Sequence, residues 1–301
     1  MGESIGAADH WPGLTIALVG GDEREQEIAR LAACTGARVN AFGFPWPEAG
    51  IEGVTSAKSA AQALTGARIA LFPIPGMAMD GSLFGTEKII PDRDLLSAME
   101  DHAHIIMGTA DEGLRQAADS LGIPIHEYES DQELMLLRAP AIVEAALKVI
   151  IENTKITIHK ASICVVGQGN IGTVLTRTLV ALGGRVTVAA RNPVQRAMAY
   201  TMGAEGVPIE NLAQAAPRFD ILLSTVPAPV VGKRVIDRLP KTAFVADMSA
   251  PPGGVDLDYA RATGRNAVWA RALGRRAPVT VGGSQWSGIR KTINKILTEE
   301  A

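Results

Sequence analysis

The sequence predicts an α/β protein made of two doubly wound domains, each with a mostly parallel sheet. Two observations lead to this prediction: short apolar runs alternate with helical patterns in both halves of the chain, and the chain has 301 residues. Alternating strands and helices imply parallel strands covered by helices on both faces of the sheet. A chain of this length is typical of two domains.

Bulk composition excludes several classes of function. The chain is 47% hydrophobic and 20% charged, which suits a substantial core, and its formal net charge is −3. We expect no nucleic-acid binding, because phosphate contacts need a clustered basic surface. No apolar run is long enough to span a bilayer and the first residues do not resemble a signal peptide, so we expect a cytoplasmic protein without membrane contact.

Neither cysteines nor histidines suggest a metal centre. Cys34 and Cys164 stand alone inside apolar stretches and are expected to be small buried side chains in a reducing compartment. The five histidines follow no metal-binding spacing, so no metal site is predicted. His159 precedes the first strand of the second half, and we expect it to be structural.

The first half of the chain carries five strand patterns with helices between them. The apolar runs predict strands at residues 14–19, 38–42, 68–72, 104–107 and 123–127. Helices are expected at residues 23–35, 56–64, 92–99 and 112–121. The segment from about residue 77 to 91 reads as a long loop, and such length hints at a functional segment.

The two halves are joined by the longest helical pattern, residues 131–153. Pro140 is expected to break or kink it, and residues 141–152 to form the connector. We therefore place the first domain at residues 1–150 and the second at 151–285. By analogy with two-domain dehydrogenases, the terminal segment 286–301 is expected to return to the first domain.

The second half restarts the alternation with greater regularity. Strands are expected at residues 162–166, 185–189, 221–224, 243–247 and 267–269. Helices are expected at residues 171–182, 194–202, 210–215, 232–238, 257–263 and 288–299.

A glycine-rich run lies between the first strand and first helix of this second half. Its first glycine permits a tight turn, its second lets a backbone approach a pyrophosphate, and its third lets helix and strand pack closely. Unpaired N–H groups at the helix start favour an anion. The run predicts a dinucleotide-binding Rossmann domain, with contacts from Gly167, Gln168, Gly169, Asn170, Ile171 and Gly172.

The end of the next strand favours NADP(H) over NAD(H). An NAD site normally places Asp or Glu there to hold the ribose 2′-hydroxyl. This chain has Arg191 and Asn192 instead. The planar fork of Arg191 can pair with a 2′-phosphate, and Arg196 could assist one helical turn later. The alternative is that Arg191 is an ordinary solvated surface residue.

Two further segments follow strands whose carboxyl ends should flank the ribose and nicotinamide. Their candidate cofactor contacts are Thr225, Val226, Pro227, Asp247 and Ser249. For Asp247 a structural role, capping the turn before residues 251–254, is equally compatible with the sequence.

Several segments together resemble a known family. They are residues 19–24, which read Val-Gly-Gly-Asp-Glu-Arg, the stretches 140–144 and 157–159, the glycine run, Ala190-Arg191, and residues 247–256. In this order they resemble the A subunit of dipicolinate synthase, the dehydrogenase-like subunit of spore-forming bacteria, over roughly residues 14–297. Residues 271–278 depart from the family, which carries a Pro-Gly-Leu-Pro-Gly-like turn there.

The resemblance implies an activity and a partner. The activity is NADP-dependent oxidation of dihydrodipicolinate, or of its hydrated tetrahydro precursor, to dipicolinate on a branch of the lysine pathway during sporulation. The partner is the flavoprotein-like B subunit, and we expect a homo-oligomer or hetero-oligomer.

The ring oxidation needs a base and cations for a dianionic substrate. Glu144 matches a family glutamate and is the candidate catalytic residue, as general base. Arg138, Arg275 and Arg276 lie near predicted helix or loop ends and are candidate substrate contacts. The alternative for each of these four is an ordinary solvated or capping charge at the surface.

Two alternatives stay open. One is an NADP-dependent 2-hydroxy-acid or amino-acid dehydrogenase. Many such enzymes use a catalytic histidine in the C-terminal part of the chain, and here none follows His159, which counts against this alternative except for lysine-based amino-acid dehydrogenases. The other is a noncatalytic protein that only binds NADP(H), because no acid–base dyad stands out.

Overall fold

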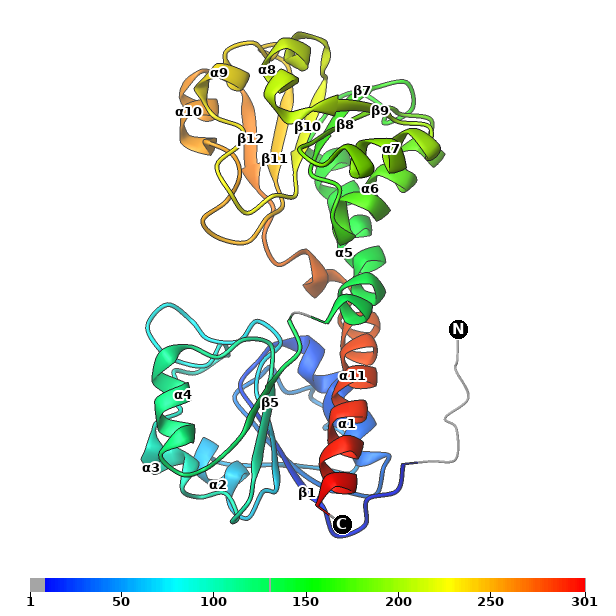
Figure 1. The fold of residues 1–301 in the computed structure, drawn as a ribbon. Helices are drawn as coiled ribbons and strands as arrows, with labels where there is room; N and C mark the ends of the chain where they lie inside the picture. Colours follow the sequence, from blue (N-terminus) through cyan, green and yellow to red (C-terminus); the bar gives the residue numbers. More distant parts are fainter. Residues whose placement is uncertain (1–8, 130, 301) are drawn as a thin grey trace. The chain divides into compact units, whose positions relative to one another are not determined.

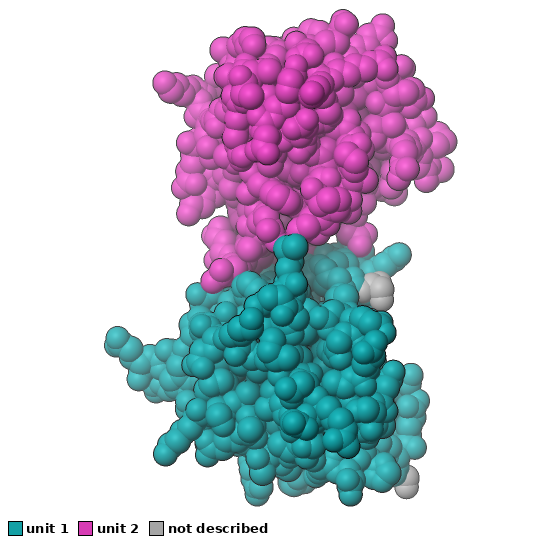
Figure 2. Space-filling model, turned by 90° about the vertical axis from the view of Figure 1, so that its left-hand side faces the viewer, with its two compact units in different colours: residues 1–138, 277–301 teal, residues 139–276 magenta. Residues whose placement is uncertain are grey.

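The computed structural model describes residues 9–129 and 131–300, which form two compact units. Unit 1 contains the chain up to Arg138 and the segment from Ala277 onward, and unit 2 runs from Ala139 to Arg276 (Figure 2). The boundaries therefore lie at 138/139 and 276/277 rather than after residues 150 and 285. The long helix α5 (Gln132–Asn153) explains the first difference, because its later apolar side chains belong to the core of unit 2.

The sheet of unit 1 has six parallel strands in the order β3-β2-β1-β4-β5-β6. Figure 1 labels β1 and β5 among them. The strands are β1 (Thr15–Val19), β2 (Arg38–Phe42), β3 (Val54–Ser56), β4 (Ile69–Leu71), β5 (His104–Met107) and β6 (Ile125–Glu127). The sequence prediction missed β3. This strand has three residues, pairs only with β2, and exposes most of its surface. The sequence therefore has no buried apolar run at this place that would predict a strand.

Helices cover both faces of this sheet. One face buries an apolar cluster under α2 (Ala60–Leu64), α3 (Arg93–Leu96) and α4 (Glu112–Asp119). On the other, α1 (Glu23–Ala33) packs on β1 and β2 and lies beside α11 (Pro278–Glu299). The terminal helix starts ten residues earlier than expected. Its first turns contain three β-branched residues and two glycines, so packing on α1 rather than helix propensity sets this start.

Unit 2 repeats the architecture, with six parallel strands in the order β12-β11-β10-β7-β8-β9. They are β7 (Ser162–Val166), β8 (Arg185–Ala190), β9 (Glu205–Pro208), β10 (Ile221–Ser224), β11 (Phe244–Asp247) and β12 (Asn266–Trp269). The prediction missed β9, an edge strand that contains a glycine and a proline, both unfavourable in strands.

Successive side chains of β7 point to opposite faces of this sheet, as a strand requires. Ile163 and Val165 enter one core cluster with residues of α5, α6 (Asn170–Ala181) and α7 (Pro193–Thr201). Cys164 and Val166 enter a second cluster with α8 (Leu212–Ala215), α9 (Lys233–Ile236) and α10 (Leu257–Ala262). Three short 3₁₀ helices complete the elements: Ile209–Asn211, Ala216–Arg218 and Leu273–Arg276.

The predicted fold class is confirmed: both units are doubly wound, and both sheets follow the strand order 3-2-1-4-5-6 of dinucleotide-binding domains. One cysteine departs from expectation. Cys164 is buried in β7, but Cys34, the C-cap of α1, is exposed. Within residues 9–129 and 131–300, no helix has the length and apolar content that a membrane crossing requires.

Candidate functional site

The glycine run forms the turn between β7 and α6, at the point where the strand order of unit 2 reverses. Gly167 has φ +95°, and a side chain there would come within 2.6 Å of the Val226 side chain. At Gly172 a Cβ would lie 2.3 Å from the Gly167 carbonyl oxygen. These two glycines are required by the packing of the protein itself. They hold the start of α6 directly against the end of β7.

Gly169 is different, because no protein atom lies within 4 Å of the position of its missing Cβ. The protein alone does not require a glycine there. The N–H groups of residues 170–172 precede the first helical hydrogen bond, which Thr173 donates to the Gly169 carbonyl. As N-cap, Gly169 also has no side chain to accept a bond from them. The turn therefore combines open space with helix-end donors, as a pyrophosphate cradle does.

The other helices that carry a first-turn cap make this contrast clear. In α1, α2, α3, α4, α7 and α10 an Asp, Ser or Asn side chain accepts a hydrogen bond from the first turn. Unit 1 has the same strand order, yet Asp22 caps its equivalent helix and the Gly21 N–H donates to the Phe84 carbonyl at 2.6 Å. Both units thus have the strand order of dinucleotide-binding domains. Of the two described turns, the one in unit 2 leads into a first helix that no side chain caps.

The side chain of Gln168 does not face this cradle. It is 3% exposed, and its Oε1 accepts a hydrogen bond from the Thr176 hydroxyl at 2.9 Å. Gln168 therefore fixes the turn from inside, and only its backbone is available to a cofactor. Among the expected contacts nearby, Thr225 donates from Oγ1 to the Val166 carbonyl, while Pro227 is exposed.

Arg191 is exposed directly after β8, where an NAD site would have a carboxylate. Arg196 was expected to assist as a phosphate contact, but its Nη1 donates to the carbonyls of Ala190 and Arg191 at 2.8 and 2.7 Å. It thereby holds the turn that carries Arg191. Asn192 caps α7 by accepting from the Val194 N–H at 2.8 Å. The turn is thus held from two sides, with the Arg191 side chain at the surface.

Asp247 has the structural role that the sequence left open. Its side chain is buried, and Oδ1 accepts from the N–H and hydroxyl of Ser249 at 3.0 and 2.6 Å. Oδ2 accepts from the N–H groups of Gly254 and Val255 at 2.7 and 3.0 Å. With four donors already bound, the carboxylate has no capacity left for a ribose hydroxyl. Asp247 and Ser249 instead shape the loop that follows β11.

The candidate base, Glu144, lies on α5 and forms an ion pair with Arg276, a candidate substrate contact. Both side chains are about half exposed, at 59% and 42%. Glu144 also lines a hollow of about 430 Å³ together with Thr173 and Arg177 of α6, the helix that begins at the phosphate turn. The structure therefore brings together two residues that the sequence selected for different reasons.

The other two candidate cations are placed differently. Arg138 belongs to unit 1 and its guanidinium holds Glu129, with Nη2 2.6 Å from Oε1. The guanidinium of Arg138 is therefore already engaged in an ion pair. Arg275 is an exposed residue of the 3₁₀ helix Leu273–Arg276 in unit 2, next to Arg276.

A buried charged cluster in unit 1 was not identified as a functional feature from the sequence. Arg24 donates from Nε and Nη2 to both oxygens of Asp22 at 2.7 Å. Glu25 accepts from the N–H groups of Asp22 and Ile74, and burial raises its pKa to about 7 despite the adjacent Arg24. Burial also raises the pKa of Tyr128, whose hydroxyl has no hydrogen-bond partner among the described residues. The Gly-Gly-Asp-x-Arg motif was the available signal, but spacing alone does not show that these charges are buried.

Comparison with known proteins identifies relatives over the whole chain. Residues 15–129 match the family model for the N-terminal domain of the A subunit of dipicolinate synthase, and residues 149–263 match the shikimate / quinate 5-dehydrogenase family. The A subunit of dipicolinate synthase from Bacillus subtilis (strain 168) is 26% identical over 292 residues, which are 96% of this chain and 98% of the relative. The chain is similar to this subunit over nearly its whole length. The resemblance seen in the sequence is thereby confirmed.

Two solved structures agree over nearly the full length. The crystal structure of the dipicolinate synthase A subunit from Bacillus halodurans superposes with a TM-score of 0.85 at 27% identity, covering 94% of this chain and 98% of that one. The Bacillus subtilis protein gives 0.85 at 25% identity, with 97% and 99% covered. The chain is thus a dehydrogenase-fold protein like these relatives, and their name implies that they have a second subunit as partner.

Proposed function

We propose that this protein is an NADP-dependent dehydrogenase that oxidises dihydrodipicolinate, or its hydrated tetrahydro precursor, to dipicolinate during sporulation. The cofactor choice depends on one observation above all. The turn after β8 presents Arg191 where an NAD site has a carboxylate, and Arg196 and Asn192 hold that turn. Similarity over the whole chain to the dehydrogenase-like subunit of dipicolinate synthase supports the substrate.

The residues present fit a bound NADP⁺. The open space at Gly169 and the N–H groups of residues 170–172 would receive its pyrophosphate, and Arg191 its 2′-phosphate. Thr225, Val226 and Pro227 follow β10 beside this turn and would border the ribose and nicotinamide. Bound NADP⁺ supplies a hydride acceptor, so the ring loses one hydride and one proton. The hydrated precursor also loses one water.

The proton requires an acceptor, and we assign it to Glu144. Arg276 holds the Glu144 carboxylate in the ion pair. A substrate carboxylate that pairs with Arg276 would release Glu144 at the moment when a base is needed. Arg275, next to Arg276 in unit 2, is a further proposed substrate contact. For Arg138, in unit 1, a substrate contact would require exchanging Glu129 for the substrate.

Turnover tests this proposal. The purified chain, given dihydrodipicolinate and NADP⁺ with and without the flavoprotein-like B subunit, should form NADPH and dipicolinate in equal amounts. NADP(H) binding without product under both conditions would favour a noncatalytic cofactor-binding protein. Faster NADP⁺ reduction with 2-hydroxy acids or amino acids would favour the alternative dehydrogenase. We further expect the protein to be cytoplasmic. We also expect a homo- or hetero-oligomer, and sedimentation with and without the B subunit would establish the oligomeric state.

A further inference from the structure

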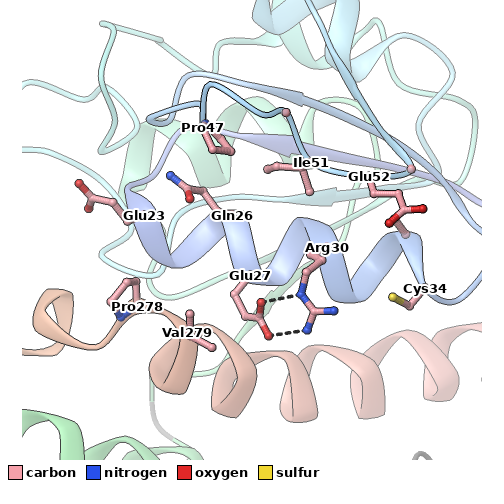
Figure 3. Close-up of a pocket in the computed structure, with 13 residues that line it drawn as sticks. Glu23, Gln26, Glu27, Arg30, Cys34, Pro47, Ile51, Glu52, Pro278 and Val279 are labelled. Carbon is pink, nitrogen blue, oxygen red and sulfur yellow. Dashed lines mark hydrogen bonds and ion pairs between the residues drawn. The ribbon is translucent and has the colours of Figure 1, made fainter.

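A groove of about 650 Å³ runs along α1 on the outside of unit 1. Its floor is one stripe of that helix, and its walls are the loop 47–53 and the first turn of α11 (Figure 3). The floor residues recur at helical spacing over eleven positions, which corresponds to about 16 Å of helix. The lining residues are Glu23, Gln26, Glu27, Arg30, Ala33, Cys34, Pro47, Gly50, Ile51, Glu52, Gly53, Pro278 and Val279.

Both walls are fixed against the floor by close contacts. At Gly282 a Cβ would lie 2.5 Å from the Arg24 carbonyl oxygen, so α11 can approach α1 only because this residue is glycine. At Gly53 a Cβ would lie 3.0 Å from the Ala33 Cβ. Gln26 also holds the chain just before the loop wall, by donating to the Pro45 carbonyl at 2.7 Å. The groove is therefore a built feature rather than the result of a loose loop.

The groove combines apolar walls with an acidic lining. Ile51 and Val279 lie on opposite walls (Figure 3), and Val279 is 65% exposed although it is aliphatic. Three glutamates line the groove against one arginine, and that arginine, Arg30, is paired with Glu27 through two contacts of 2.8 Å. Glu52 is exposed on the loop wall. This pattern fits an apolar side chain flanked by lysine or arginine.

We propose that this groove docks a segment of the partner protein that carries an apolar anchor between basic residues. The partner is the B subunit of the same organism, and this identification rests on the proposed function. An apolar anchor seated between Ile51 and Val279 would cover aliphatic surface that is otherwise exposed to water. A neighbouring lysine or arginine would meet Glu52, so ionic strength should weaken the association.

Charge reversal and polar substitution in the groove test this directly. We expect Glu52→Lys, Ile51→Asp and Val279→Asp each to weaken binding of the purified B subunit at least tenfold in titration calorimetry. The matched controls Glu48→Lys and Thr280→Asp change exposed neighbours on the same two walls that do not line the groove. They should stay within twofold of the unmodified chain.

Several outcomes would overturn the inference. Groove variants that bind the B subunit as tightly as the controls would do so, as would absence of binding by the unmodified chain. Sedimentation that shows the groove variants to lose self-association instead would assign the groove to a second copy of this chain. NADPH formation is measured on the same proteins. If NADPH formation is lost in every variant and in both controls, that result bears on the proposed function. If binding of the B subunit is lost while the affinity for NADP(H) is retained, that result bears on the groove alone.

Discussion

Arg191 is the residue on which the choice between the two nicotinamide cofactors depends. Replacing it with alanine should weaken NADP(H) by about ten- to a hundredfold, the usual value of a charge-assisted contact. NAD(H) lacks the 2′-phosphate and should be affected much less. Titration calorimetry with both cofactors measures the ratio.

Arg185 offers a matched control at the other end of β8. It is an exposed arginine of the same strand, but it lies at the amino end, away from the proposed cofactor edge. Arg185→Ala should leave both affinities unchanged. Equal losses for both cofactors in Arg191→Ala would show that Arg191 does not recognise the 2′-phosphate.

Glu144 carries the proposed proton transfer. Glu144→Gln should reduce kcat by about a hundred- to ten-thousandfold, the usual contribution of a general base, and leave the NADP(H) affinity unchanged. Glu152→Gln is the control, since Glu152 is an exposed acid two turns later on the same helix. If kcat in Glu144→Gln stays within threefold, another group accepts the proton and Glu144 only pairs with Arg276.

Glu25 should make stability depend on pH. Burial raises its pKa from 4.5 to about 7, so the folded chain holds this proton more tightly than the unfolded chain. The contribution is fully present below about pH 4.5 and is lost as the pH rises through about 7. Relative to Glu25→Gln, the unmodified chain should therefore lose between about 1 and 3 kcal/mol of unfolding free energy from about pH 4.5 to about pH 8. The same difference in unfolding free energy between the two proteins at both pH values, measured by denaturation, would contradict this.

The positions of these residues could be predicted from the sequence better than their roles. The place of Arg191 followed from counting one strand beyond the glycines. The roles of Arg196 and Asp247 did not follow, because each is decided by partners several residues away: two carbonyls for Arg196 and four donors for Asp247. Such partners appear only once the turns are folded. The same holds for the pairing of Glu144 with Arg276 across 132 residues.

At the scale of elements, the start of α6 is the feature that a dinucleotide needs. Gly169→Ala should preserve the fold, because φ is −82° and no protein atom lies within 4 Å of the added Cβ. That methyl would occupy the space into which the pyrophosphate should enter. We therefore expect an unchanged Tm without ligand and at least tenfold weaker NADP(H) binding.

Gly232 provides the control for this substitution. It also is the N-cap of a helix in unit 2, with φ −95° and no neighbour within 4 Å of a Cβ. Gly232→Ala should alter neither Tm nor cofactor affinity. Unchanged affinity in Gly169→Ala would place the pyrophosphate elsewhere.

Most elements could be predicted from the sequence, because buried parallel strands are continuous apolar runs. The misses share a physical cause. The edge strands β3 and β9 are short and bury little, so hydrogen bonding to one neighbour defines them rather than hydrophobicity. The early start of α11 depends on the contact of Gly282 with α1, which connects residues far apart in the sequence.

At the scale of the whole molecule, two units with the same strand order differ at the start of their first helix. In unit 1 the first helix is capped by Asp22 and its preceding turn is occupied by the Phe84 carbonyl. In unit 2 the equivalent helix begins at the open Gly169. Strand order alone therefore does not assign a cofactor site, and the sequence distinguished the units only through the glycine run and Arg191.

Transfer of hydride from the ring to NADP⁺ is the central claim, and isotopic labelling tests it most directly. The purified chain, with the B subunit present, is incubated with NADP⁺ and dihydrodipicolinate deuterated at its saturated ring carbons. The products are then analysed by mass spectrometry. We expect one NADPH carrying one deuterium on its nicotinamide ring for each dipicolinate formed. Dipicolinate that appears without labelled NADPH would contradict it.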